Sequence, residues 1–236
     1  MRTPLEAIVI YSDSTAFPRE TLVSPSKAWP VLLSPESNSV YLRGKGGIQA
    51  KGLLKMLRED SYYFGFRTST NQHRLVIFAF GIVDCSPQPI TYKLKIISRI
   101  PKLGPRLWET IAKYLSPHRV KIQENLSFRF TSPSKFQKHL EEMIRTVTNK
   151  NTKIIVLQTP MPGQQALIRS PGLVDSVRRY NQIKRQVSSI FPNVIFVELE
   201  VDANLGYVSQ EDGIHFSDFG HSQVASAIVG SIPDFT

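Results

Sequence analysis

Five short apolar runs are spread along the chain, and stretches with helical spacing separate most of them. The runs cover residues 8–11, 40–42, 75–80, 154–157 and 194–197. A run of four or more hydrophobic residues is typical of a strand buried on both faces, as in a parallel sheet. Helices are expected at residues 48–57, 134–147, 173–190 and 222–229. Strands that alternate with helices predict an α/β fold, with a parallel sheet of about five strands and helices on both faces.

Composition limits the number of domains and the compartment. The chain has 236 residues, 41% of them hydrophobic, and contains no apolar run long enough to span a membrane. We find no repeat or low-complexity linker, so one domain over residues 1–236 is expected. No signal-peptide hydrophobic region precedes the first strand, and the one cysteine, Cys85, allows no internal disulfide. These features favour a cytoplasmic location.

The chain is basic, with a formal net charge of +10. Nine of its Lys and Arg residues lie in residues 86–130, against two acidic residues. We interpret this stretch as a basic helical insertion, either a lid or a binding face for an anionic polymer, or simply a solvated surface. A basic surface favours an anionic substrate such as an acidic glycan. Nucleic acid is not expected as a partner, because no nucleic-acid motif accompanies the charge.

Small polar residues follow the first strand in the stretch Ser12-Asp13-Ser14-Thr15. Such residues suit a tight turn and a helix N-cap, which by itself would explain them. The turn would also hold a hydroxyl at the carboxyl end of a central strand, where open α/β sheets bind their ligands. Ser14 is therefore our candidate nucleophile.

Candidate partners for Ser14 lie near the C-terminus. Asp212 and His215 are three residues apart in a loop that follows a strand. A carboxylate orients an imidazole, and the imidazole takes the proton of a serine hydroxyl. Asp218 and His221 have the same spacing, but Ser217 or Asp218 is expected to cap the last helix, so His215 is preferred. The other histidines are expected at the surface: His73, His118 and His139.

Glycines cluster after the second expected strand, in the stretch Gly44-Lys45-Gly46-Gly47. A glycine-rich turn lets backbone N–H groups approach a ligand at the edge of the sheet. The simpler interpretation is that these glycines only turn the chain.

Taken together, these motifs resemble those of the SGNH (GDSL-type) hydrolase superfamily. Its first motif, Gly-Asp-Ser, corresponds to Ser12-Asp13-Ser14, and its final Asp-x-x-His corresponds to Asp212-Gly213-Ile214-His215. The glycine of its second motif falls within residues 44–47. The resemblance covers nearly the whole chain except residues 86–130, and it implies a three-layer flavodoxin-like fold with sheet order 2-1-3-4-5.

The resemblance also implies a role for each site residue. Ser14 would be the nucleophile, His215 the base and Asp212 the orienting acid. The oxyanion hole would use the backbone N–H groups of Ser14 and Gly47, with Gly46 as the alternative to Gly47. The third family motif, Gly-x-Asn-Asp, departs from the pattern, because Val83 stands where the asparagine donates to the oxyanion. Losing one such donor typically costs about 10²–10³ in rate.

These residues predict a serine-dependent acyl-ester hydrolase that acts on an acylated small molecule or glycan. The preferred substrate, O-acetyl groups on a glycan, is what the resemblance implies, because the chain resembles SGNH-like proteins of bacterial surface polysaccharides. Two alternatives use the same scaffold: an acyltransferase to a polysaccharide hydroxyl, and a catalytically weak, glycan-binding pseudoenzyme. No cofactor and no metal are expected, because the sequence contains no zinc-ligand spacing and no phosphate-binding glycine loop.

Overall fold

The structure is a computed structural model of the 236-residue chain. It describes residues 7–17, 23–33, 39–64, 66, 74–87, 110, 129–199 and 206–232. Most of the expected basic insertion, residues 86–130, therefore lies outside the described residues, as do His73 and His118.

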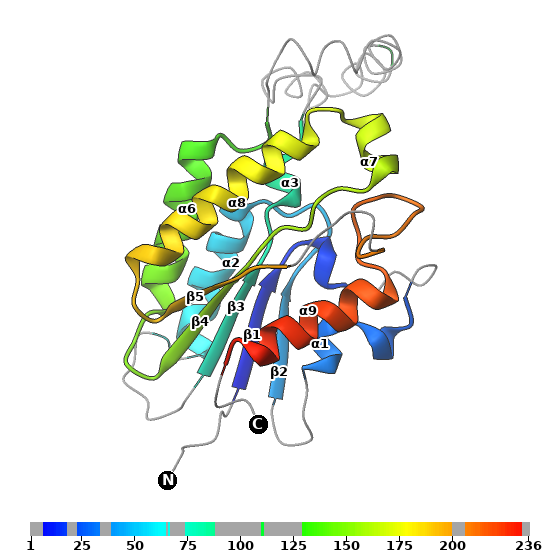
Figure 1. Cartoon of the computed structure of the whole chain (residues 1–236). Helices are drawn as coiled ribbons and strands as arrows, with labels where there is room; N and C mark the ends of the chain where they lie inside the picture. The colour runs from blue at the N-terminus through cyan, green and yellow to red at the C-terminus, as the bar shows by residue number, and fades with distance from the viewer. Residues whose placement is uncertain are drawn as a thin grey trace.

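A five-stranded parallel sheet forms the centre of the molecule, in the order β2-β1-β3-β4-β5 (Figure 1). The strands are β1 (Ala7–Ser12), β2 (Ser39–Gly44), β3 (Arg74–Ala79), β4 (Thr152–Leu157) and β5 (Val194–Val197). Every residue of β3 is buried, and so are all residues of β1 except the first. This burial on both faces explains why the central strands are unbroken apolar runs. The predicted fold class and strand order are confirmed.

Helices cover both faces of the sheet, so the fold has three layers (Figure 1). One face carries α2 (Ala50–Tyr63), α6 (Pro133–Val147) and α8 (Leu173–Ile190). The other face carries α1 (Trp29–Leu32) and α9 (Asp218–Gly230). Short helical turns follow the carboxyl ends of three strands: η1 (Ser14–Ala16), α3 (Ile82–Cys85) and α7 (Gln164–Arg169). A further turn, η2 (Pro25–Lys27), precedes α1.

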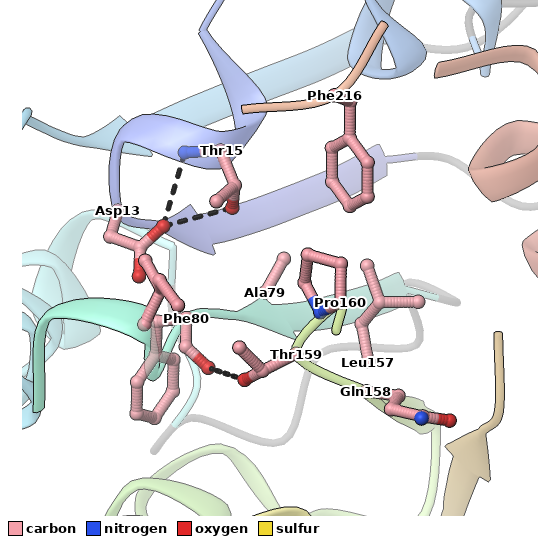
Figure 2. Close-up of a pocket in the computed structure, with 10 residues that line it drawn as sticks. Asp13, Thr15, Ala79, Phe80, Leu157, Gln158, Thr159, Pro160 and Phe216 are labelled. Carbon is pink, nitrogen blue, oxygen red and sulfur yellow. Dashed lines mark hydrogen bonds between the residues drawn. The ribbon is translucent and has the colours of Figure 1, made fainter. Parts of the chain in front are cut away.

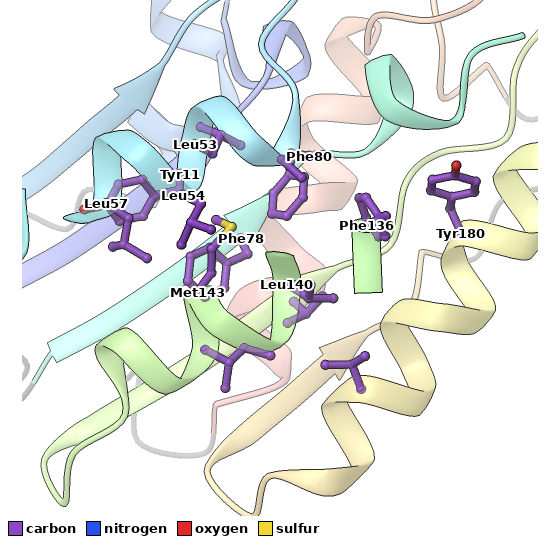
Figure 3. Close-up of a cluster of buried hydrophobic side chains, with 14 of the residues drawn as sticks. Tyr11, Leu53, Leu54, Leu57, Phe78, Phe80, Phe136, Leu140, Met143 and Tyr180 are labelled. Atoms are coloured by element: carbon purple, nitrogen blue, oxygen red, sulfur yellow. The ribbon is translucent and has the colours of Figure 1, made fainter. Parts of the chain in front are cut away.

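An aromatic and aliphatic core lies between the sheet and the helices α2, α6 and α8 (Figure 3). The centre of the Phe136 ring lies 5.6 Å from that of Phe80 and 4.9 Å from that of Tyr180, and both pairs of rings are tilted. Phe136 therefore links α6 to the end of β3 and to α8. Phe136, Leu140, Met143 and Val147 recur at helical spacing and are fully buried. Aromatic pairs in this geometry stabilise a core beyond simple area burial, by about 0.5–1.5 kcal/mol each.

One helix boundary is corrected. Residues 58–63 lie beyond the helix expected at residues 48–57 but continue α2, because the Asp60 side chain is buried and pairs with Arg43 at 2.5 Å and with the Tyr11 hydroxyl at 3.3 Å. That tertiary network overrides the polar local sequence.

No helix in the described ranges is both long enough and apolar enough to cross a membrane.

Candidate active site

Ser14 begins the turn that follows β1. Asp13 caps this turn: its Oδ1 accepts hydrogen bonds from the Thr15 backbone N–H at 3.1 Å and from the Thr15 hydroxyl at 2.8 Å. Its Oδ2 accepts from the Gly81 N–H at 3.0 Å. Asp13 and Thr15 are buried, whereas Ser14 is partly exposed. The turn thus leaves Ser14 partly exposed at the carboxyl edge of the sheet.

The glycine turn after β2 lies beside Ser14. Gly44 pairs in register with Ser12, and a Cβ on Gly44 would lie 1.9 Å from the Ser12 carbonyl oxygen. Only glycine therefore permits this close approach, which the φ of +154° also favours. A Cβ on Gly46 would lie 3.9 Å from the Ser14 Cβ. The turn expected to supply an oxyanion donor is thus a direct neighbour of Ser14, and Gly46 faces it.

The loop of residues 206–217 holds Asp212 and His215 in a hairpin-like shape. Ser209 N–H donates to the His215 carbonyl at 2.7 Å, and Val208 forms a bridge with Phe216. Residues at the start of α7 support the other side: Gly163 N–H donates to the Gly213 carbonyl at 2.8 Å. The loop position of His215 is therefore fixed by backbone hydrogen bonds on both sides.

Asp212 binds its neighbour three residues on. Its Oδ2 lies 2.6 Å from His215 Nδ1, and its Oδ1 accepts from the backbone N–H groups of Ile214 at 2.8 Å and His215 at 3.0 Å. Burial alone would raise the pKa of Asp212, but these hydrogen bonds outweigh it and lower the pKa from its ordinary value. Because the resulting carboxylate can only accept, Nδ1 of His215 is assigned as the donor in this pair, and in the neutral imidazole Nε2 is then the acceptor.

The free nitrogen of His215 is buried. Among the residues that the structure describes, Nε2 has no hydrogen-bond partner, and the His215 residue is 7% exposed. An unprotonated ring nitrogen held this way by a carboxylate is the arrangement that a general base needs.

The competing pair, Asp218 and His221, has a structural role instead. His221 is buried on α9, and its Nδ1 accepts the Trp29 backbone N–H at 3.1 Å. Burial lowers the pKa of His221 to about 4. Asp218 pairs with Lys27, and Ser217 is the N-cap of α9. His139, expected at the surface, is partly buried in α6.

The Ser14 turn and the His215 loop meet at one small cavity (Figure 2). Asp13 and Thr15, which flank Ser14, line this cavity together with Phe216, which follows His215. The cavity holds about 10 Å³, the space of a single water molecule. Within the described part of the chain, no hydrogen bond joins Ser14 Oγ to His215 Nε2. Such bonds are often long in unliganded sites and tighten when substrate binds.

Val83 lies in α3, partly buried against the core, and carries no side-chain donor. Its neighbour Asp84 is fully buried and its carboxylate is held by hydrogen-bond donors of other segments. Both Asp84 oxygens accept from the Ala50 backbone N–H, at 3.0 and 3.1 Å, and Oδ1 also accepts from the Thr131 hydroxyl. Asp84 therefore caps α2 across the sheet edge.

Several polar residues around the site were not identified from the sequence, namely the anchoring carboxylates Asp13 and Asp84 and the buried Lys184. Asp13 belongs to the motif Ser12-Asp13-Ser14, but its sequence context indicated no function for it. Lys184 lies on the buried face of α8, and a lysine at an apolar helical position was a usable signal.

No group of three or more His, Cys, Asp or Glu side chains that could hold a metal ion occurs among the described residues.

The chain is similar to known proteins in its fold, although the comparisons of its sequence find no match. No protein-family model matches the sequence, and no curated protein matches it. Solved structures do match over nearly the whole chain. A structure described as a lipase/acylhydrolase from Enterococcus faecalis is 16% identical, with a TM-score of 0.63 over 96% of this chain and 94% of that one.

Two further structures are similar to the same extent. A member of the lipolytic G-D-S-L family from Veillonella parvula is 13% identical, with a TM-score of 0.64 over 97% of this chain and 99% of that one. A carbohydrate acetylesterase family member from Sinorhizobium meliloti is 12% identical, with a TM-score of 0.60 over 95% of both chains. The chain therefore has the SGNH (GDSL-type) hydrolase fold, as the motifs predicted.

Proposed function

We propose that this protein is a serine-dependent acyl-ester hydrolase with Ser14 as nucleophile, His215 as general base and Asp212 as the orienting acid. One observation carries the proposal: Asp212 binds His215 Nδ1 at 2.6 Å, and Nε2 of the same ring is buried and has no partner among the described residues, in a loop beside the Ser14 turn. Packing gives no reason for this nitrogen to be buried unbonded, because a buried polar atom without a partner is costly.

The mechanism follows from these roles. Ser14 Oγ attacks the ester carbonyl carbon while His215 Nε2 takes its proton, and the Oγ–C bond forms as the carbonyl oxygen becomes an oxyanion. The backbone N–H groups of Ser14 and Gly47 are proposed to donate to that oxyanion, with Gly46 as the alternative to Gly47. Collapse breaks the ester C–O bond, and His215 returns its proton to the departing alcohol. Water then hydrolyses the acyl-enzyme by the same sequence.

The substrate we favour is an O-acetyl group on a glycan. The support is the fold shared with a described carbohydrate acetylesterase and a lipase/acylhydrolase, together with the net charge of +10, which favours an anionic glycan. Transfer of the acyl group to a sugar hydroxyl would use the same residues, with the hydroxyl in place of water.

Hydrolysis of p-nitrophenyl acetate by the purified protein tests the reaction. The wild-type protein should release p-nitrophenol well above the rate of Ser14→Ala and of His215→Asn. Ser26→Ala, at an exposed serine, and His139→Asn are the matched controls and should behave as the wild type. Equal rates for the wild type and Ser14→Ala would refute the proposal.

A second candidate is a glycan-binding module with little catalysis, and Val83 favours it because a valine cannot donate to an oxyanion. This function predicts retention on an anionic glycan matrix that falls as salt rises, since screened charges bind weakly. Retention that is the same at low and high salt would remove the electrostatic part of this function.

A further inference from the structure

A lysine without exposed surface lies beneath the proposed active site. Lys184 of α8 is 0% exposed, and its ammonium donates to the Leu157 carbonyl and to the Thr159 hydroxyl, each at 2.8 Å. The same ammonium lies 5.6 Å from the centre of the Phe80 ring. A buried ammonium is expensive unless hydrogen bonds and opposite charges compensate it. The two hydrogen bonds satisfy its donors only in part and neutralise no charge.

The compensating charges lie across the turn at Gly81. A Cβ on Gly81 would lie 3.4 Å from Lys184 Nζ, and the Gly81 N–H donates to Asp13 Oδ2 at 3.0 Å. The width of one glycine therefore separates the ammonium from the Asp13 carboxylate. Asp84 follows three residues after Gly81, and both Asp13 and Asp84 are 0% exposed. Lys184 forms no direct ion pair within the described part of the chain, so its charge acts on both carboxylates through low-dielectric protein.

These two carboxylates hold the segments around Ser14. Asp13 binds the Thr15 N–H and hydroxyl on one side and the Gly81 N–H on the other, so it joins the Ser14 turn to the Gly81 turn. Asp84 accepts from the N–H of Ala50, three residues after Gly47, and so fixes the start of α2 and the glycine turn before it. In every one of these bonds the carboxyl group accepts, which is the role of its charged form.

We propose that Lys184 is a positioning residue of the Ser14 site: its buried ammonium keeps Asp13 and Asp84 in their charged, accepting form, and those carboxylates hold the three segments that surround Ser14. This inference rests on the proposed role of Ser14. Lys184 itself does not touch substrate.

The electrostatics agree with this geometry. Burial is the largest cause of the raised pKa of Asp84, which is about 7 in all; the hydrogen bonds from Thr131 and Ala50 and the charge of Lys184 lower it, and the charge of Asp13 raises it. Burial also raises the pKa of Asp13, and the hydrogen bonds from Thr15 and Gly81, with the charge of Lys184, oppose that shift. Burial lowers the pKa of Lys184 to about 8, and the nearby anions oppose this shift. The titratable groups that face Lys184 are Asp13, Cys85 and Asp84, and Tyr180 also faces Asp84.

The first test needs no activity. We compare Lys184→Met with Arg185→Met, which removes a charge from the next, exposed residue of α8. In the wild type, Asp84 has a raised pKa, so its contribution to the free energy of unfolding falls from about pH 4 to about pH 7. Lys184 has a lowered pKa, so its contribution rises from about pH 8 to about pH 10.5. In Lys184→Met, the fall in the free energy of unfolding should extend above pH 7, and the rise between about pH 8 and pH 10.5 should be absent. Arg185→Met should keep the wild-type curve.

If Lys184→Met does not fold, the double variant Lys184→Met/Asp84→Asn decides, because it removes one buried charge of each sign. It should fold and should lack the fall in stability near neutral pH. A Lys184→Met curve with the wild-type pH dependence would overturn the proposal. So would a double variant that is as unfolded as the single variant.

The second test uses p-nitrophenyl acetate hydrolysis. Lys184→Met should lower kcat at pH 7 by about 10-fold or more, with KM nearly unchanged, because misplaced catalytic groups slow the chemical step. The acidic limb of its kcat–pH profile should move up by about one pH unit or more, since Asp84 then ionises later. A purely structural role would lower the active fraction without moving this limb, and that result would overturn the proposal. Equal hydrolysis by the wild type and Ser14→Ala would instead refute the proposed function, while the stability test would still decide the coupling.

Discussion

The contacts of Asp212 allow its two carboxylate oxygens to be tested separately. Asp212→Asn keeps an oxygen for the backbone N–H groups of Ile214 and His215, which Oδ1 now accepts at 2.8 and 3.0 Å. It places an amide N–H against His215 Nδ1, where Oδ2 now accepts at 2.6 Å. Nδ1 must then accept, so the proton moves to Nε2 and the base is lost. An amide at this position of a hydroxyl–imidazole–carboxylate triad lowers kcat by about 10⁴.

Asp212→Ala is the matched variant, because it also removes the acceptor of the two backbone N–H groups. The Asp212 side chain is 15% exposed, so each lost bond should cost about 1 kcal/mol and the pair about 2 kcal/mol. For a chain of 236 residues this corresponds to a Tm lower by about 4–8 °C. Asp212→Asn should retain most of that stability, within about 1 kcal/mol of the wild type.

The assay combines thermal unfolding with p-nitrophenyl acetate hydrolysis for the three proteins. We expect both variants to lose activity and only Asp212→Ala to lose stability. A folded Asp212→Asn protein with wild-type kcat would refute the assignment of Asp212 as the orienting acid.

Three further predictions follow from other parts of the structure. Val83→Asn should raise kcat for p-nitrophenyl acetate, by up to about 10²–10³ if the new amide reaches the oxyanion, and an unchanged kcat in the folded variant would show that no donor is missing there. Because burial lowers the pKa of His221 to about 4, the unfolded chain binds one more proton between about pH 4 and 6.5. The contribution of His221 to stability should therefore be full above pH 6.5 and be lost, by about 3 kcal/mol, as the pH drops to 4, opposite in direction to the contribution of Asp84; chemical denaturation of His221→Gln should show that this contribution is missing, and a slope identical to that of the wild type would contradict the shift. Gly213→Ala should lower Tm and kcat together, because a Cβ at Gly213 would lie 2.8 Å from the Gly163 carbonyl oxygen and disturb the Asp212 loop; wild-type values of both would contradict the close packing.

The central fold was predictable because its signals are local. The buried strands β1, β3 and β4 are continuous apolar runs, and α8 and β5 occupy the predicted residues. The end of α2 was not predictable, because residues 58–63 are polar and are held in the helix by the buried Asp60 pairing with Arg43, 17 residues away in sequence. Periodicity carries no information about such a distant partner.

In the candidate site too, contacts within one loop were predictable from the sequence, whereas contacts between distant segments were not. The pairing of Asp212 with His215 follows from a three-residue spacing in one loop, and the structure shows it. The roles of Asp13 and Asp84 depend on acceptors and donors in other elements, such as the N–H groups of Gly81 and Ala50. The spacing of residues along the sequence does not indicate which side chains and backbone N–H groups come together at the carboxyl edge of the sheet. The joint action of Ser14, His215 and Gly47 in catalysis stays a prediction.

The most direct measurement of the central claim is covalent labelling of the protein by a fluorophosphonate, followed by peptide mapping. Such reagents modify a serine hydroxyl whose proton an adjacent base removes. We expect one adduct, on Ser14, that is lost in His215→Asn and retained in His139→Asn. A wild-type protein without an adduct on Ser14, or with the same labelling of Ser14 in His215→Asn, would contradict the central claim.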